Sequence, residues 1–132
     1  MAANTAPVFV LTPVAAQANV AAANTNRDGT GTLVDLVTGG TDGTRIDRIV
    51  AKAAVTTTAG MLRIFHYDGT SNRLIDEIPV SAITPSASVE SFSAELVRGD
   101  GLPYIVLKSG DKLKVTMHNA ESMNVWAIGG SY

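Results

Sequence analysis

Apolar and polar residues alternate most regularly along residues 112–118. Side chains two positions apart lie on the same face of a strand, so this pattern predicts a β-strand with one buried and one solvent-facing side. The buried side is expected to carry the apolar residues Leu113, Val115 and Met117. The solvent-facing side is expected to carry Lys112, Lys114, Thr116 and His118.

Short runs rich in β-branched residues recur from residue 32 onward, and clusters of Gly, Asp, Ser and Asn separate them. The predicted strands span residues 32–38, 45–57, 61–67, 73–80, 89–97, 104–108, 112–118 and 124–128. This spacing predicts an all-β, single-domain antiparallel β-sandwich, jelly-roll-like, with about eight strands. The three-residue turn at 109–111 argues for pairing of its two flanking strands within one sheet, whereas a jelly roll places them in opposite sheets.

The structures of residues 45–57 and of the segment around residues 68–72 follow from their local residue types. Residues 45–57 also fit a helical stripe, but the β-branched residues at their end and the lack of a capping signal favour a long strand. Residues 68–72 are turn formers between two β-type runs and predict a hairpin. Pro79 and Pro85 are expected to end the second strand of this hairpin, because proline cannot donate to a sheet.

The first 26 residues contain no charged side chain and are rich in alanine. We interpret residues 1–26 as an extended N-terminal arm or edge strand, followed by a sandwich domain at 27–132. Deletion of residues 1–23 is expected to leave a folded sandwich and to weaken assembly, since an extended arm can add to the sheet edge of another chain. The apolar residues of the arm are the candidate interface: Pro7, Val8, Phe9, Val10, Leu11, Val14 and Val20.

Composition and charge exclude several classes of partner and of chemistry. The chain has 132 residues and a formal net charge of −2, so bulk charge gives no reason to expect a nucleic-acid or membrane partner. It contains no Cys, which excludes thiolate metal sites, disulfides and Cys-based catalysis. Only 17% of residues are charged while 45% are hydrophobic, so we expect another subunit to cover some apolar surface in a homo-oligomer, a dimer or trimer.

Candidate catalytic or metal-binding residues are few. His66 lies near the end of a predicted strand and Asp68 follows two residues later on the same side, which allows a two-ligand metal site or a base with its orienting carboxylate. No third partner is spaced to converge on them, so we favour a packed, hydrogen-bonded histidine, and we expect His118 to be a plain surface residue. Residues 24–35 partly resemble a calcium loop but lack its first acidic ligand, so we favour a flexible lead into the first strand.

Other polar and aromatic residues suggest no chemistry. Asp76 and Glu77 are adjacent in a strand and are expected to face opposite ways, which excludes a paired acid and base. Trp126, Tyr104 and Tyr132 could form a sugar-binding platform, although a lone Trp in an apolar strand is more often part of the core. We therefore predict no enzyme, no catalytic residue, no cofactor and no metal.

Residues 26–31, 57–61, 65–69 and 117–125 resemble small virion proteins of tailed bacteriophages. The resemblance covers about residues 24–132 and consists of turn and strand motifs, without a catalytic signature. It implies an all-β component of a phage particle that is assembled in the host cytoplasm. The best-fitting group is the head decoration (cement) proteins, which are commonly jelly-roll-like and oligomeric. It carries over no functional residue.

These features together predict a capsid decoration protein that stabilises the head by bridging capsid subunits. Its expected partners are the major capsid protein or other virion proteins, and further copies of itself. A tail, collar or baseplate component is an alternative that copy number per particle would distinguish. A carbohydrate-binding or receptor-binding sandwich module is another, and it depends on exposure of Trp126.

Overall fold

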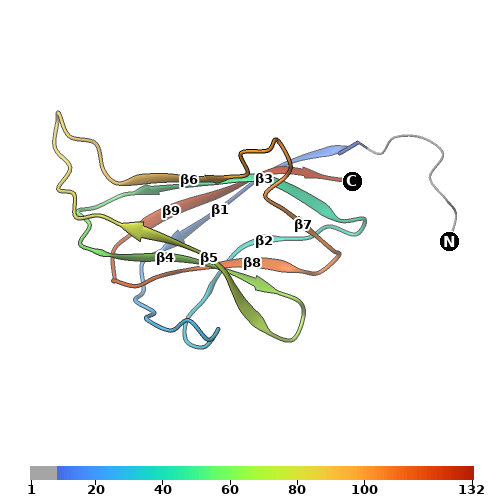
Figure 1. Ribbon diagram of the computed structural model, residues 1–132, viewed down its shortest axis with the longest axis horizontal. Coiled ribbons are helices and arrows are strands. Elements are labelled where there is room, and N and C mark those ends of the chain that lie inside the picture. Colours follow the sequence, from blue (N-terminus) through green and yellow to red (C-terminus); the bar gives the residue numbers. More distant parts are fainter. Residues whose placement is uncertain (1–8) are drawn as a thin grey trace, which may run out of the picture.

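The computed structural model describes residues 9–132, which form an all-β sandwich of two antiparallel sheets (Figure 1). The first sheet has the strand order β1-β9-β3-β6, with β7 also pairing with β3, and the second has the order β2-β8-β4-β5. The strands are β1 (Thr12–Val20), β2 (Val34–Thr38), β3 (Thr44–Ala53), β4 (Gly60–Tyr67), β5 (Asn72–Val80), β6 (Ser93–Val97), β7 (Ile105–Leu107), β8 (Lys112–Met117) and β9 (Met123–Ser131). The predicted all-β sandwich is confirmed.

The connectivity is that of a jelly roll, because the chain crosses between the sheets at most connections. The expectation that the turn at 109–111 joins partners within one sheet is wrong. The short strand β7 pairs with β3, and the turn then carries the chain into the second sheet, where β8 begins. Gly39 holds this crossing in place, since its N–H donates to the Asp111 carbonyl and its own carbonyl accepts from Gly110.

The core between the sheets follows the period-2 pattern of the sequence. Leu113, Val115 and Met117 are at most 1% exposed, as predicted for the apolar face of β8. They meet Met123, Val125 and Ala127 of β9 and the apolar faces of the other strands within one hydrophobic cluster. Burial of these side chains, at roughly 25 cal/mol per Å² of apolar surface, is the main stabilising contribution to the fold.

Residues 45–57 are a strand as predicted, but β3 ends at Ala53. The predicted hairpin is present, since β4 and β5 pair along their lengths. β5 ends at Val80, the predicted end, one residue after Pro79. β5 is an edge strand and pairs with a neighbour on one side only, so the missing N–H of Pro79 need not cost a hydrogen bond of the sheet. At the other end of the chain, β9 extends beyond the predicted residue 128 through Ser131.

The N-terminal arm divides into parts with different roles. Residues 12–20 are the edge strand β1, which pairs with β9 along its whole length. Val20 is 1% exposed in the core, and Val14 packs against the core from one side. Deleting residues 1–23 would therefore remove a sheet strand and a core side chain, and this deletion is expected to destabilise the sandwich rather than to leave it intact.

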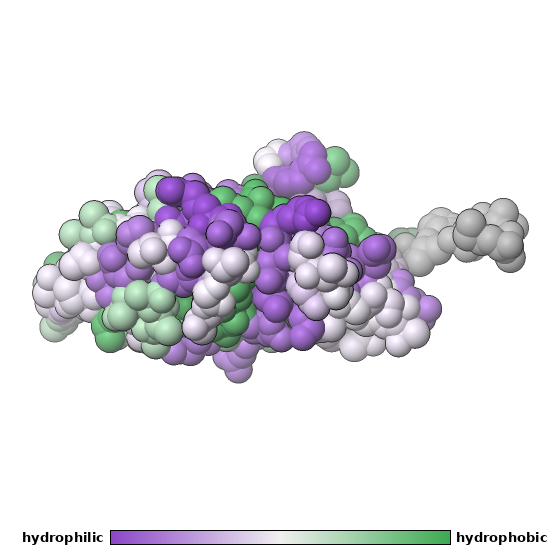
Figure 2. Space-filling model, turned by 90° about the horizontal axis from the view of Figure 1, so that it is seen from below, coloured by the Kyte–Doolittle hydropathy of each residue, from purple (hydrophilic) through white to green (hydrophobic). Residues whose placement is uncertain are grey.

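The connection from β1 to β2 covers the outer face of the second sheet. Asn24 N–H donates to the Met117 carbonyl, and the Asn72 amide donates to the Gly29 carbonyl. Under this cover, Arg63, Phe65 and Thr116 are at most 1% exposed although they point away from the core cluster. The prediction that Thr116 faces solvent is wrong for this reason. The segment at 24–35, predicted as a flexible lead, is tied to the second sheet by these hydrogen bonds, although most of its side chains are exposed. In Figure 2, viewed from this side, hydrophobic residues show only in small, separated areas.

Candidate functional site: polar clusters and a docking surface

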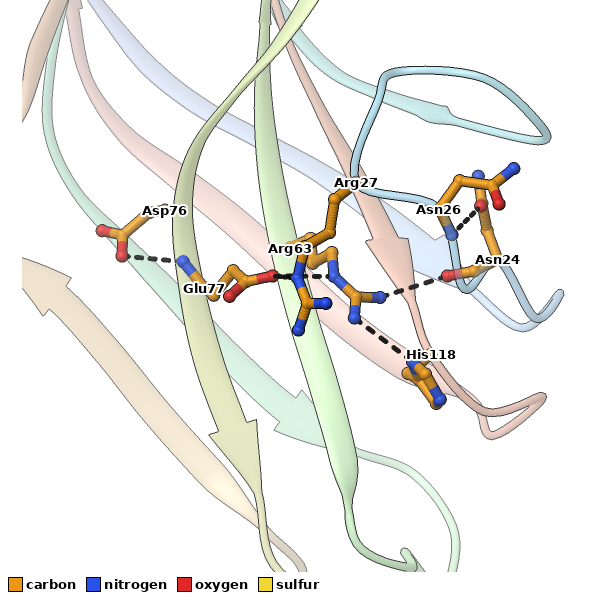
Figure 3. Close-up of polar contacts among 7 residues, drawn as sticks. All are labelled: Asn24, Asn26, Arg27, Arg63, Asp76, Glu77 and His118. Carbon is orange, nitrogen blue, oxygen red and sulfur yellow. Dashed lines mark hydrogen bonds and ion pairs between the residues drawn. The ribbon is translucent and has the colours of Figure 1, made fainter.

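The most extensive polar cluster surrounds Arg63 on β4 (Figure 3). Its guanidinium donates to Glu77 Oε1 at 2.9 Å, to the Asn24 carbonyl at 3.3 Å and to His118 Nδ1 at 3.2 Å. A guanidinium has no acceptor, so His118 accepts through Nδ1 and carries its proton on Nε2. His118 is therefore a half-buried partner of Arg63, and the prediction of a plain surface histidine is wrong.

Glu77 on β5 joins this buried arginine to an exposed one. Arg27, from the β1–β2 connection, donates through Nε to the same Oε1 atom that accepts from Arg63. The hydrogen bonds from Arg27 and then Arg63 hold the pKa of Glu77 below its ordinary value of 4.5. The cluster thus clamps the covering segment onto the second sheet, and its charged groups are used within the fold.

We predict that this clamp makes stability depend on acid pH. A carboxylate whose pKa is lowered by folding stabilises the native state above its unfolded pKa, and the contribution is lost as pH falls through the folded pKa. The melting temperature of the native chain should therefore exceed that of Glu77→Gln at neutral pH, and the difference should shrink below pH 4.5. Thermal melts across this range measure it, and a difference unchanged at about pH 3 would contradict the role given to Glu77.

The segment with a partial calcium-loop pattern is closed by its own hydrogen bonds. The Asn24 amide, which is 5% exposed, donates to the carbonyls of Thr30 and Thr32. Asp28 Oδ1 accepts from the backbone N–H and hydroxyl of Thr30, and these bonds lower the pKa of Asp28. Within residues 9–132 no three His, Cys, Asp or Glu side chains gather in a way that could hold a metal ion. The oxygens of this loop accept hydrogen bonds from groups of the same loop.

The other histidine, His66, is hydrogen-bonded as we favoured, but its partner is remote in sequence. His66 Nε2 lies 3.1 Å from Oδ2 of Asp111, whose side chain is 6% exposed. Asp68 instead accepts from the N–H groups of Thr70 and Ser71 in the hairpin turn. The structure therefore does not bring His66 and Asp68 together as a base with its orienting carboxylate.

Asp76 and Glu77 project to opposite sides of β5, as predicted (Figure 3). Asp76 accepts a 3.1 Å hydrogen bond from the hydroxyl of Tyr104, which packs against the core. Burial, followed by the charge of Asp76, raises the pKa of the Tyr104 hydroxyl. This second pair fastens the segment before β7 to the opposite sheet.

The three candidate platform aromatics have different surroundings. Trp126 is half-buried on the outer face of the first sheet, where Gln17 and Val50 lie opposite it on the neighbouring strands. It lies outside the core cluster, so the preference for a core tryptophan is wrong. Tyr104 packs against the core, and Tyr132 lies close to Gly43. The three side chains do not make up one shared platform.

Exposed apolar side chains cluster at the start of the described chain. Phe9 is 73% and Leu11 82% exposed, and both precede β1. Val10 contacts Gly130, Val14 packs against the core and Val20 is buried, so these three contribute to the sandwich itself. Pro7 and Val8 lie outside the described residues. We call Phe9 and Leu11 the apolar pair, and within residues 9–132 they are the strongly exposed part of the predicted interface.

The outer face of the first sheet carries apolar side chains among polar ones, which the sequence did not reveal. The register places Ala15, Ile128, Arg48 and Val97 in one row across four strands. Ile128 is half-buried and Val97 is 59% exposed, and neither belongs to the core cluster. The signal was present only as apolar residues on both faces of a strand, which sequence alone cannot distinguish from complete burial.

Comparison with known proteins adds no relative. No protein-family profile matches the chain, and no curated protein matches it. Within the described residues, no helix is long and apolar enough to cross a membrane.

Proposed function

We propose that this chain is a structural protein of a tailed-phage particle, a head decoration protein that stabilises the shell by bridging capsid subunits. The observation that carries the proposal is the exposed apolar pair, Phe9 at 73% and Leu11 at 82%, at the end of a sandwich. Large apolar side chains exposed together at one site mark a protein contact more often than isolated ones do. The resemblance of residues 26–31 and 117–125 to small phage virion proteins supplies the kind of assembly.

The polar clusters support a structural role. Arg63, Glu77 and His118 hold the covering segment in place, and Asp76 holds Tyr104. His66 pairs with Asp111 near the turn between β7 and β8. Each of these groups has a use within the fold, which is what a rigid building unit requires.

The docking energy can be estimated from the apolar pair. Full burial of a side chain such as Phe or Leu stabilises a contact by about 1.5–3 kcal/mol. Two such side chains, discounted for the fraction already buried and for the ordering of the chain, contribute about 3 kcal/mol per copy, or roughly 100-fold in affinity.

The proposal predicts that Phe9→Ser with Leu11→Ser weakens attachment to phage particles that lack the protein, by roughly 100-fold. Co-sedimentation of the purified protein with such particles measures this. Val89→Ser is the matched control, since Val89 is 47% exposed in the connection between β5 and β6, and Figure 1 shows this connection at the opposite end of the molecule from the start of β1. Equal binding by the double variant and the native chain would overturn the role of the pair.

Purified virions also distinguish a location on the head from other locations in the particle. Stoichiometry of hundreds of copies per virion supports a decoration protein, whereas tens or fewer support a tail, collar or baseplate component. Absence of the protein from purified virions would overturn the proposal as a whole.

A further inference from the structure

The strand β1 leaves one long edge of the first sheet without a neighbour. Its nine residues pair with β9, and no other strand of the described chain pairs with it. The pairing runs from Thr12 to Val20 without a register shift, and the strand contains no charged residue. A long, regular and uncharged edge exposes backbone groups that can pair with another chain.

Among the strands of residues 9–132, the edge strands β5, β2 and β6 carry features that oppose pairing with another chain, and β1 largely lacks such features. On β5, Pro79 removes a donor, and Arg73, Asp76 and Glu77 bring charge. On β2, five residues long, the register shifts after Asp35, whose carboxylate binds Lys112 at 2.7 Å. On β6, also five residues long, Glu95 pairs with Arg48. Short length, bulges, proline and charge are the usual means of preventing edge pairing, and β1 has only Pro13 near its start.

We propose that β1 pairs antiparallel with β1 of a second copy, about a two-fold axis at Gln17. Residues 14–20 then pair with residues 20–14 of the second copy, and Pro13 lies outside the ladder. Val14 stands opposite Val20 of the second copy, Ala16 opposite its Ala18, and Gln17 opposite its Gln17. A two-fold interface uses the same surface on both subunits, and a neutral strand meets its own copy without opposing like charges.

The pairing joins the first sheets of two sandwiches into one continuous sheet. Val14, Ala16 and Ala18 pack against the core from the edge and are half-buried, so a second copy would cover what remains exposed. Ala15, Gln17 and Asn19 are exposed on the outer face. The two backbones would then lie at the spacing of neighbouring strands in a sheet, about 4.8 Å.

The role that we give to this dimer rests on the proposed decoration function, to which it adds a second attachment point. The ladder begins at Val14, so the apolar pair of each copy stays outside it. Two such pairs related by a two-fold axis give a bivalent attachment, which can bridge two capsid subunits and raises the overall avidity without a new contact. The second copy is therefore the partner that turns a single docking unit into a clamp.

Gln17→Lys tests the proposal, because it places two lysines opposite each other at the two-fold axis. Gln17 is exposed, so the single copy should fold normally. By analytical ultracentrifugation we expect the native chain to sediment as a dimer of 13.7 kDa chains and the variant to dissociate at least roughly tenfold more readily. Thr38→Lys, an equal change at an exposed position of β2, is the control and should remain dimeric.

A charge exchange distinguishes a lost interface from a damaged strand. Gln17→Glu should also dissociate, and an equal mixture of the Lys and Glu variants should recover the dimer. A native chain that remains monomeric at about 100 μM, a mixture that stays monomeric, or a Gln17→Lys chain as dimeric as the native one would overturn the proposal. These measurements need no phage particle, so a dimer that fails to bind virions refutes the decoration role alone, and a virion-bound monomer refutes the dimer alone.

Discussion

Gly129→Ala is expected to lower the free energy of unfolding by about 3 kcal/mol, the upper part of the usual range for overpacking. A Cβ at this position would run into the carbonyl oxygen of Arg45 on β3, closer than real Cβ atoms come to any neighbour. The obstacle is backbone, so no side-chain rotation can relieve it. Gly129 stands opposite Ile46, next to the register shift that bends β3. Either β9 must move away from β3, or the shift must be rebuilt.

Urea denaturation measures this effect through the midpoint of unfolding. Gly99→Ala is the matched control, because a Cβ at Gly99 meets nothing within 4 Å. It should leave the free energy of unfolding within about 0.5 kcal/mol of that of the native chain, as exposed substitutions usually do. If the two variants unfold at the same urea concentration, the close approach of β9 to β3 is wrong.

Arg63→Met is expected to cost about 3 kcal/mol, since removing one member of a buried polar cluster leaves its partners unsatisfied. Arg63 is 1% exposed and donates to three groups on separate segments: Glu77, the Asn24 carbonyl and His118. Methionine keeps most of the volume and none of the donors. For a domain of this size the melting temperature should fall by roughly 10 °C.

Arg27→Met provides the control on the same carboxylate. Arg27 also binds Glu77, but its side chain is 58% exposed, and exposed ion pairs contribute at most about 1 kcal/mol. Differential scanning calorimetry of both variants should therefore separate them clearly. Equal losses would mean that the buried position of Arg63 has no special importance for the covering segment.

Most of the strands were predictable because the chain carries a local signal for them. Alternation along residues 112–118 identified the core face of β8, and turn formers at 68–72 identified the β4–β5 hairpin. The β-branched end of residues 45–57 correctly favoured a strand over a helix for β3. Each inference concerns residues within a few positions of one another, where side-chain period and turn chemistry are decisive.

The candidate site was less predictable because its partners come from distant segments. His66 meets Asp111, and Arg63 meets His118. The misplaced residues share a cause: Thr116 and His118 lie under or beside a cover that comes from residues before β2. Trp126 is the converse case, since an apolar strand segment expected in the core turned one face outward.

By itself the sequence determined an all-β chain without thiol chemistry, its main turns, and a neutral, apolar N-terminal region, because these follow from composition and from side-chain period along one strand. Only the tertiary structure decided that residues 12–20 form the open edge of a sheet, that residues 21–33 bury Arg63, and that Phe9 and Leu11 stay exposed. The physical reason is that burial and edge position depend on which remote segment lies alongside, and no local pattern encodes that choice.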